Sequence, residues 1–168
     1  MIIKKKAVKF GNNINTDVIL PGKYLELTQP EELGKHAMEG VDPNFSLKVR
    51  DGVILVGGRN FGCGSSREQA PIALKYAGVE CVLAEYFARI FYRNCINIGL
   101  PAIECEGISE NVEEEDLISI DLKKGIVKNE SKDVNFKITP IPEFLMSILE
   151  DGGLIQHLRK ELKINVNS

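Results

Sequence analysis

The stretch GVILVGGRNFGCGSSREQAPIALKYAGVECVLAE, residues 52–85, decides the fold. It begins with an apolar run bounded by glycines, which is typical of a strand buried on both faces. Residues 68–78 predict a helix that ends at Gly78, and residues 79–85 predict the next buried strand. Because parallel strands need such a crossover, this order indicates a partly parallel sheet with helices packed on it.

The segments on either side continue the alternation. Residues 28–40 predict a short helix with Thr28 as N-cap and Pro30 in the first turn. The other expected elements are a strand in 5–10, a helix or helical turns in 86–99, a strand in 100–105, a hairpin in 116–129, a strand in 134–139, and helices in 141–153 and 154–162. We therefore expect one α/β domain over residues 1–168, with a mixed, partly parallel sheet.

Composition limits the class of protein. The 168 residues are 43% hydrophobic with a net charge of -3, which is typical of one globular domain and disfavours nucleic acid or an anionic membrane as the main partner. No apolar run approaches the roughly 20 residues of a membrane span, and the lysine-rich start lacks the apolar core of a signal peptide. These features predict a cytoplasmic protein.

The cysteines and histidines offer little material for a metal site. The four cysteines, at positions 63, 81, 95 and 105, show no C-x-x-C pairing, so free, reduced thiols are expected. The two histidines, His36 and His157, are interpreted as surface or edge residues and not as ligands. We expect no metal or cofactor held by this chain alone.

Residues 57–71, GGRNFGCGSSREQAP, carry a cluster of glycines, two serines and an arginine at the predicted start of a helix. Ser65 and Glu68 have the S-x-x-E spacing of a capping box, which gives a purely structural interpretation. The alternative is a site for a small anion, because a helix N-terminus attracts carboxylate or phosphate and Arg67 could grip a carboxylate with its fork. The stretch is neither a Walker loop nor G-x-G-x-x-G, and its residues alone leave both interpretations open.

A second candidate surface lies upstream, in residues 12–27. Polar Asn15, Thr16 and Asp17 precede an apolar run and then Pro21-Gly22. Loops of this composition are common, so the residues alone favour a loop with Asx-type turns. The functional alternative is a substrate loop in which Lys23 or the side chains of residues 24–27 line a pocket.

Three motifs together closely resemble one family. FGNNINTDVILPGKYL, GGRNFGCGSSREQAP and ARIFYRNCINIGLP are similar to the small subunits of 3-isopropylmalate dehydratases, the swivelling domains of the aconitase superfamily. The resemblance covers nearly the whole chain and keeps the family's order of motifs. It implies a swivelling β/β/α fold and a separate large subunit that carries a [4Fe–4S] cluster on three cysteines. It also implies dehydration and rehydration of a hydroxy-acid, which in leucine biosynthesis converts 2-isopropylmalate to 3-isopropylmalate.

The same resemblance implies roles for individual residues. Ser65 would be the base that removes the carbon-bound proton, Ser66 and Arg67 would hold substrate carboxylates, and Asp17 would belong to the wall of the site. The loop that helps to choose the substrate's side group corresponds here to Lys23, Tyr24, Leu25, Glu26 and Leu27.

The sequence leaves several acids as candidate substrates. In that loop Leu25 and Leu27 suit an alkyl group such as isopropyl, whereas Glu26 would repel the extra carboxylate of homoaconitate unless it points to solvent. The alternatives are small subunits of homoaconitase or of citraconate/2-methylmalate or 2,3-dimethylmalate dehydratases. Two alternatives are not enzymes of this family: the chain could be a non-catalytic anion-binding module, or a redox or metal sensor that uses Cys63.

Overall fold

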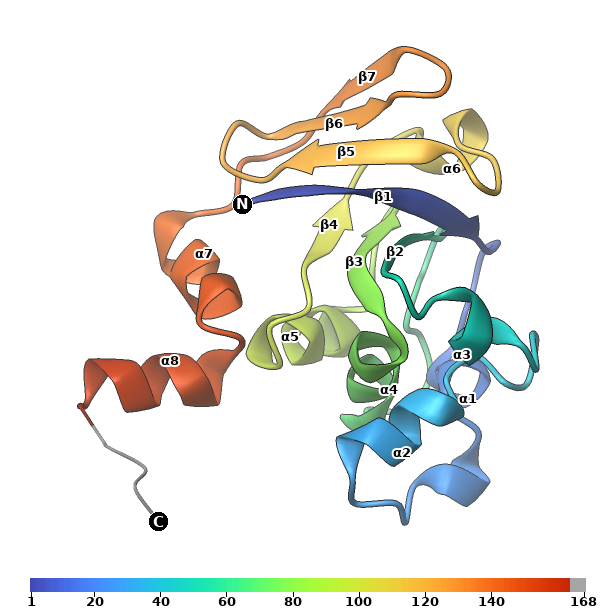
Figure 1. Cartoon of the computed structure of the whole chain (residues 1–168), viewed down its shortest axis with the longest axis vertical. Helices are drawn as coiled ribbons and strands as arrows, with labels where there is room; N and C mark the ends of the chain where they lie inside the picture. Colours follow the sequence, from blue (N-terminus) through green and yellow to red (C-terminus); the bar gives the residue numbers. More distant parts are fainter. Residues whose placement is uncertain (164–168) are drawn as a thin grey trace.

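A mixed sheet forms the centre of the computed structural model, which describes residues 1–163 (Figure 1). Within those residues it has seven strands in the order β4-β3-β2-β1-β5-β6-β7. The parallel strands are β1 (Ile2–Lys9), β2 (Val53–Val56), β3 (Val79–Ala84) and β4 (Ala102–Glu104). The antiparallel strands that continue from the other edge of β1 are β5 (Leu117–Asp121), β6 (Ile126–Asn129) and β7 (Val134–Lys137). The expected mixed, partly parallel sheet is confirmed.

Helices cover this sheet. Their bounds are α1 (Thr16–Ile19), the 3₁₀ turn η1 (Gly22–Tyr24), α2 (Pro30–Lys35), α3 (Phe45–Lys48), α4 (Gln69–Ala77), α5 (Arg89–Asn97), α6 (Ile108–Asn111), α7 (Glu143–Glu150) and α8 (Leu154–Glu161). In the part of the chain that the structure describes, none of them is long and apolar enough to cross a membrane.

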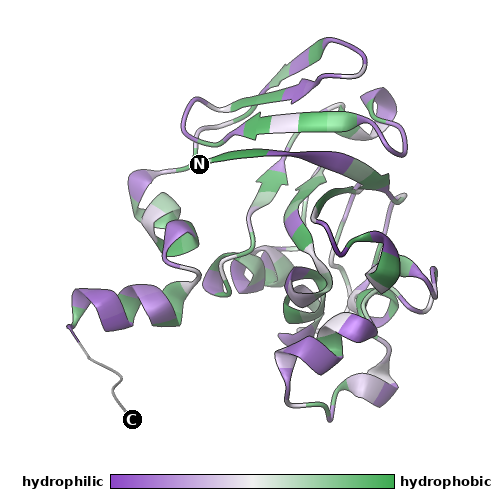
Figure 2. Cartoon of the chain, viewed as in Figure 1, coloured by the Kyte–Doolittle hydropathy of each residue, from purple (hydrophilic) through white to green (hydrophobic). Residues whose placement is uncertain are grey.

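The core has one apolar cluster on each face of the parallel strands. Successive residues of a strand point to opposite faces, so Leu55 packs in the cluster that α2 and α4 cover, and Ile54 packs in the cluster that includes α6 and α7. Strands β2 to β4 are accordingly coloured mainly as hydrophobic in Figure 2. Burial on both faces explains why these segments read as continuous apolar runs.

The structure contradicts the expectations for residues 28–40 and for His157. The helix expected over 28–40 spans only Pro30–Lys35. Helix α2 begins at Pro30 with Gln29 as N-cap, and no side chain caps it, so Thr28 does not serve as N-cap. The reason is that a proline disfavours helical backbone in the residue before it, which fixes the boundary at Gln29. His157 is not a surface residue: it is 8% exposed, and its Nδ1 lies 2.8 Å from Asp151 Oδ2.

The parallel arrangement brings three loops to one edge of the sheet. Because β1, β2 and β3 run in the same direction, the segments that follow them, residues 10–15, 57–68 and 85–88, leave from the same side. Ligand sites of open α/β sheets lie outside the carboxyl ends of the strands. The predicted site residues of the glycine-serine stretch fall on this edge.

Candidate active site

Backbone hydrogen bonds hold the three loops together. Gly62 N donates to Ile14 O at 2.7 Å, and Thr16 N donates to Cys63 O at 2.9 Å, so the loops after β1 and β2 run side by side. The loop after β3 joins them through Ala88 N, which donates to Phe61 O at 2.9 Å. This pairing places residues 15–17 against residues 63–67.

Two glycines let the loop after β2 follow this path. Gly62 and Gly64 have φ values of +80° and +97°, which residues other than glycine rarely adopt. A Cβ on Gly62 would lie 2.1 Å from the Phe91 ring, and one on Gly64 would lie 3.4 Å from Thr16 Oγ1. Gly62 therefore lies directly against Phe91 of α5, where only a residue without a side chain fits.

Thr16 and Ser65 form the centre of the site. Thr16 is only 2% exposed, and its hydroxyl donates to Ser65 O at 2.9 Å. The two hydroxyl oxygens, Thr16 Oγ1 and Ser65 Oγ, lie 3.3 Å apart. Ser65 and Ser66 are exposed, so their hydroxyls are open to a ligand. Reasoning from sequence noted Thr16 only as part of a polar loop and missed this contact.

Arg67 is held by the loop that carries Asp17. Its Nη2 lies 2.5 Å from Asp17 Oδ1, and its Nη1 donates to Leu20 O at 3.0 Å. The Arg67 side chain is 20% exposed, whereas that of Asp17 is 66% exposed. The guanidinium is thus fixed in orientation, and further N–H groups stay available to a carboxylate.

The capping-box interpretation of Ser65 is wrong. Helix α4 begins only at Gln69, its N-cap is Glu68, and no side chain caps it. Ser65 contacts Thr16 instead, because the two loops pair with each other. Residues 66–68 then connect Ser65 to the helix. Arg67 therefore lies ahead of the first turn of α4.

A cavity of about 230 Å³ opens beside these residues. Its walls come from the loop after β2 and from the start of α5, and its lining residues are Thr16, Gly62, Gly64, Ser65, Ser66, Arg67, Ala88, Arg89, Ile90, Phe91 and Asn94. Arg89 and Asn94 were not assigned by sequence reasoning. They lie in the third motif of the resemblance, ARIFYRNCINIGLP, but nothing in their local pattern indicates that α5 faces the serines.

The predicted specificity loop lies next to Arg67 but does not line this cavity. Tyr24 stacks on His36 with ring centroids 3.7 Å apart, and its hydroxyl donates to Glu39 Oε1 at 2.7 Å. Hydrogen bonds from Tyr24 and His36 lower the pKa of Glu39, against the opposing effect of burial. Lys23 Nζ lies 5.0 Å from the centroid of the Tyr24 ring.

The other residues of that loop differ in exposure. Leu25 and Leu27 are half-buried against the core, and Glu26 is exposed to solvent. The loop approaches the site through Gly22, where an added Cβ would lie 3.7 Å from Arg67 Nη2. The condition stated for Glu26, that it point to solvent, is met in this structure.

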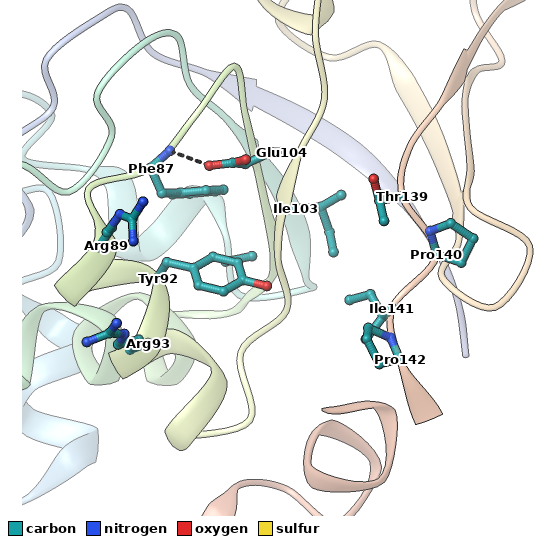
Figure 3. Close-up of a pocket in the computed structure, with 11 residues that line it drawn as sticks. Phe87, Arg89, Tyr92, Arg93, Ile103, Glu104, Thr139, Pro140, Ile141 and Pro142 are labelled. Carbon is teal, nitrogen blue, oxygen red and sulfur yellow. Dashed lines mark hydrogen bonds between the residues drawn. The ribbon is translucent and has the colours of Figure 1, made fainter. Parts of the chain in front are cut away.

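Arg89 also lines a second, larger cavity of about 500 Å³ (Figure 3). Figure 3 shows the Tyr92 ring directed toward the segment from Thr139 to Pro142. Burial raises the pKa of Tyr92, and the neighbouring Glu104 raises it further. None of the predicted site residues lines this second cavity.

The cysteines do not assemble into a metal site. All four thiols are free, and burial raises the pKa of Cys105 to about 12 and those of Cys81 and Cys95 as well. Cys63 is half-buried. Among residues 1–163, no three histidine, cysteine or acidic side chains lie close enough together to hold a metal ion. The described side chains therefore do not fit an iron–sulfur cluster as its ligands.

The fold and this loop edge define a member of a known class. Residues 2–107 match the aconitase C-terminal domain family, and the chain belongs to it. The "3-isopropylmalate dehydratase small subunit" of Halothermothrix orenii is 51% identical over 97% of this chain and 99% of the relative. The "isopropylmalate/citramalate isomerase small subunit" of Methanocaldococcus jannaschii is 56% identical over 96% of both chains.

A solved structure agrees with the fold over its full length. The crystal structure of 3-isopropylmalate dehydratase from Methanocaldococcus jannaschii has a TM-score of 0.90 and 46% sequence identity. The match covers 98% of this chain and 97% of that one. The expected swivelling domain of the aconitase type is thereby confirmed as the fold.

Proposed function

We propose that this chain is the small subunit of a hydro-lyase that isomerises 2-isopropylmalate to 3-isopropylmalate, a step of leucine biosynthesis, together with a separate large subunit in the cytoplasm. The observation that carries the proposal is the convergence of Thr16 and Asp17 with Ser65 and Arg67 beside a small cavity. The names of the two relatives, at 51% and 56% identity, support this substrate. A swivelling domain of 1–168 is proposed because β5–β7 extend the same sheet as β1.

Ser65 is proposed as the base that removes the carbon-bound proton of the substrate. A serine hydroxyl has a pKa far above neutrality, so its anion needs hydrogen-bond donors or positive charge nearby. Thr16 lies 3.3 Å from Ser65 Oγ and now donates to the Ser65 carbonyl. Rotation about its Cβ–Oγ1 bond would turn the same proton to Ser65 Oγ. The buried Thr16 thus supports the charged form of Ser65.

Ser66 and Arg67 are proposed to bind a substrate carboxylate. The fork of Arg67 is oriented before the substrate arrives, because Asp17 and the Leu20 carbonyl fix it. Asp17 would repel a carboxylate, so its contribution to the wall of the site is to position Arg67. The exposed Ser66 hydroxyl adds a neutral donor at the same mouth.

The cluster is proposed to belong to the large subunit. When bound there, it supplies a Lewis acid for the leaving hydroxyl. The described residues of this chain contribute orientation, carboxylate binding and the movement of a proton at Ser65. Since Ser65 and Ser66 are exposed, the mouth of the cavity is open to a second protein surface that could close it.

A second candidate substrate is 2-methylmalate, with citraconate as the dehydrated form. The Methanocaldococcus jannaschii relative carries both isopropylmalate and citramalate in its name. The half-buried Leu25 and Leu27 accord with an apolar side group of either size, and the exposed Glu26 accords with the absence of a third carboxylate. Homoaconitate and 2,3-dimethylmalate are included in the test as competitors.

The deciding experiment is an anaerobic assay of the chain reconstituted with its large subunit against each candidate acid. We expect turnover of 2-isopropylmalate by the complex and none by the isolated chain. Preference for 2-methylmalate would select the second candidate. No turnover of any acid, with no larger chain captured during purification, would favour a non-catalytic anion-binding module.

A further inference from the structure

The charges at the cavity do not match the proposed substrate, and the inference drawn here rests on that proposed function. A hydroxy-dicarboxylic acid is a dianion at neutral pH, because both carboxyl groups are ionised. Arg67 is the cation of the glycine-serine stretch that lines this cavity, but its ion pair with Asp17 leaves little net positive charge at that wall. Ser65 and Ser66 are neutral. Arg67 can therefore bind one carboxylate of the substrate, and the second carboxylate needs another cation.

Arg89 is the other cation that lines the cavity of about 230 Å³. It lies at the start of α5, opposite the serine loop, and it has no ion-pair partner among residues 1–163. Figure 3 labels it among the residues that line the larger cavity. An arginine without an internal partner keeps its full charge and its fork for a ligand.

Asn94 lies on the same wall, five residues further along α5. It is half-buried, and within the described part of the chain its side-chain amide makes no hydrogen bond. An amide group can donate to a carboxylate and accept from a hydroxyl. Arg89 and Asn94 thus line the same cavity as Gly62 and residues 64–67, and within residues 1–163 no ion pair holds the Arg89 guanidinium.

We infer that Arg89 binds the second carboxylate of the substrate and that Asn94 is the neighbouring hydrogen-bond donor. The substrate would then lie between two arginines on opposite walls. Arg67, which is neutralised in part by Asp17, orients one carboxylate, and Arg89 supplies the charge that balances the other. This assigns a substrate-binding role to α5 in addition to its packing role.

The test compares Arg89→Gln with Arg93→Gln in the reconstituted complex. Arg93 lies four residues further on the same helix and lines only the larger cavity, so both changes remove one charge from one helix (Figure 3). We expect Arg89→Gln to raise KM for the dicarboxylate by about 10- to 100-fold, as for a charge-assisted hydrogen bond, and Arg93→Gln to leave it within about twofold. Asn94→Ala should raise KM by a smaller factor.

Three further measurements separate the outcomes. Calorimetric binding of a dicarboxylate inhibitor to each complex should show the same loss of affinity as KM, and Arg89→Lys should recover part of it. If the wild-type complex has no activity, the proposed function is refuted, and the inference that rests on it is refuted with it. Active wild type with equal KM for the two glutamine variants would overturn the inference. So would an Arg89→Gln variant whose defect is loss of binding to the large subunit, because that result would assign Arg89 to the interface.

Discussion

The two halves of the sheet share β1 but differ in how their loops satisfy polar groups. In the antiparallel half, two side chains close their own turns: Asp121 Oδ1 accepts from Lys124 N at 2.9 Å, and Asn129 Oδ1 accepts from Ser131 N at 3.1 Å. In the parallel half, Thr16 bonds to Ser65, 49 residues away in the sequence. The loops of parallel strands cannot close on themselves, so they meet one another at one edge. That edge is where the candidate site forms.

The family match follows the same division. It covers residues 2–107 and so ends just after β4, the last parallel strand. The antiparallel strands β5–β7 lie outside the matched range and carry none of the predicted site residues. We therefore expect the parallel half to provide the chemistry and the antiparallel half to support β1.

The largest expected effect tests the chemistry of the parallel half directly. Ser65→Ala should reduce exchange of the substrate's carbon-bound proton with solvent by about 10²–10⁴-fold in the complex, because the base is lost. Since Ser65 caps no helix, the melting temperature of the Ser65→Ala variant should stay near that of wild type. The matched control is Ser119→Ala in β5, which removes a hydrogen bond to Glu130 and should leave exchange unchanged. Proton exchange near the wild-type rate in Ser65→Ala would refute its role as base.

A smaller effect is expected from Arg67→Lys. Lysine lacks the planar fork with which Arg67 contacts Asp17 and the Leu20 carbonyl and still has N–H groups for a bidentate carboxylate contact. We expect kcat/KM to fall by roughly 10- to 1000-fold, measured by steady-state kinetics of the complex. Arg159→Lys on α8 serves as the control for a general effect of the substitution. Unchanged kinetics in Arg67→Lys would contradict carboxylate binding there.

Thr16→Val should have a more moderate effect. It keeps the shape of the buried side chain but removes the hydroxyl that contacts Ser65, so we expect kcat to fall by about tenfold and stability by about 1 kcal/mol. Thr16→Ser keeps the hydroxyl and should retain most of the activity. If the two variants show equal kcat, the Thr16 hydroxyl does not assist Ser65.

The smallest effect on catalysis is expected in the antiparallel half. Ile118 of β5 is fully buried, and Ile118→Val should cost about 1 kcal/mol of stability through the lost methylene. The kcat/KM of this variant should equal that of wild type. Denaturant unfolding measures the loss of stability, and steady-state kinetics of the complex measure kcat/KM. A large kinetic defect with normal stability would show that the division between the halves is wrong.

The sequence predicts much of the fold because buried strands and helix ends leave local patterns. The run at 53–56 and the stop at Gly78 both lie where expected. The capping-box spacing at Ser65 and Glu68 misleads because local propensity competes with pairing between loops, and the pairing prevails. The resemblance identified Ser65, Ser66, Arg67 and Asp17 as a group, and the structure brings them together.

What the sequence could not predict depends on contacts between distant segments. The position of Thr16 against Ser65 and the approach of Asn94 to the same cavity follow from how parallel strands order their loops. No period or spacing within a single segment encodes that order. The burial of His157 was also missed, because the Phe144 ring of α7 packs edge-on against it while Asp151, in the link between the two helices, lies beside its Nδ1.

The unequal exposure of the four thiols makes the chain ready for site-specific labelling without mutagenesis. Cys81, Cys95 and Cys105 are buried and have raised pKa values, whereas Cys63 is half-buried. Because the thiolate is the nucleophile that attacks a maleimide, and Cys63 is the least buried of the four thiols, a dye added to the folded protein reacts first at Cys63. That dye would report from a position two residues before Ser65, so its fluorescence could follow docking of a second protein over the cavity in real time.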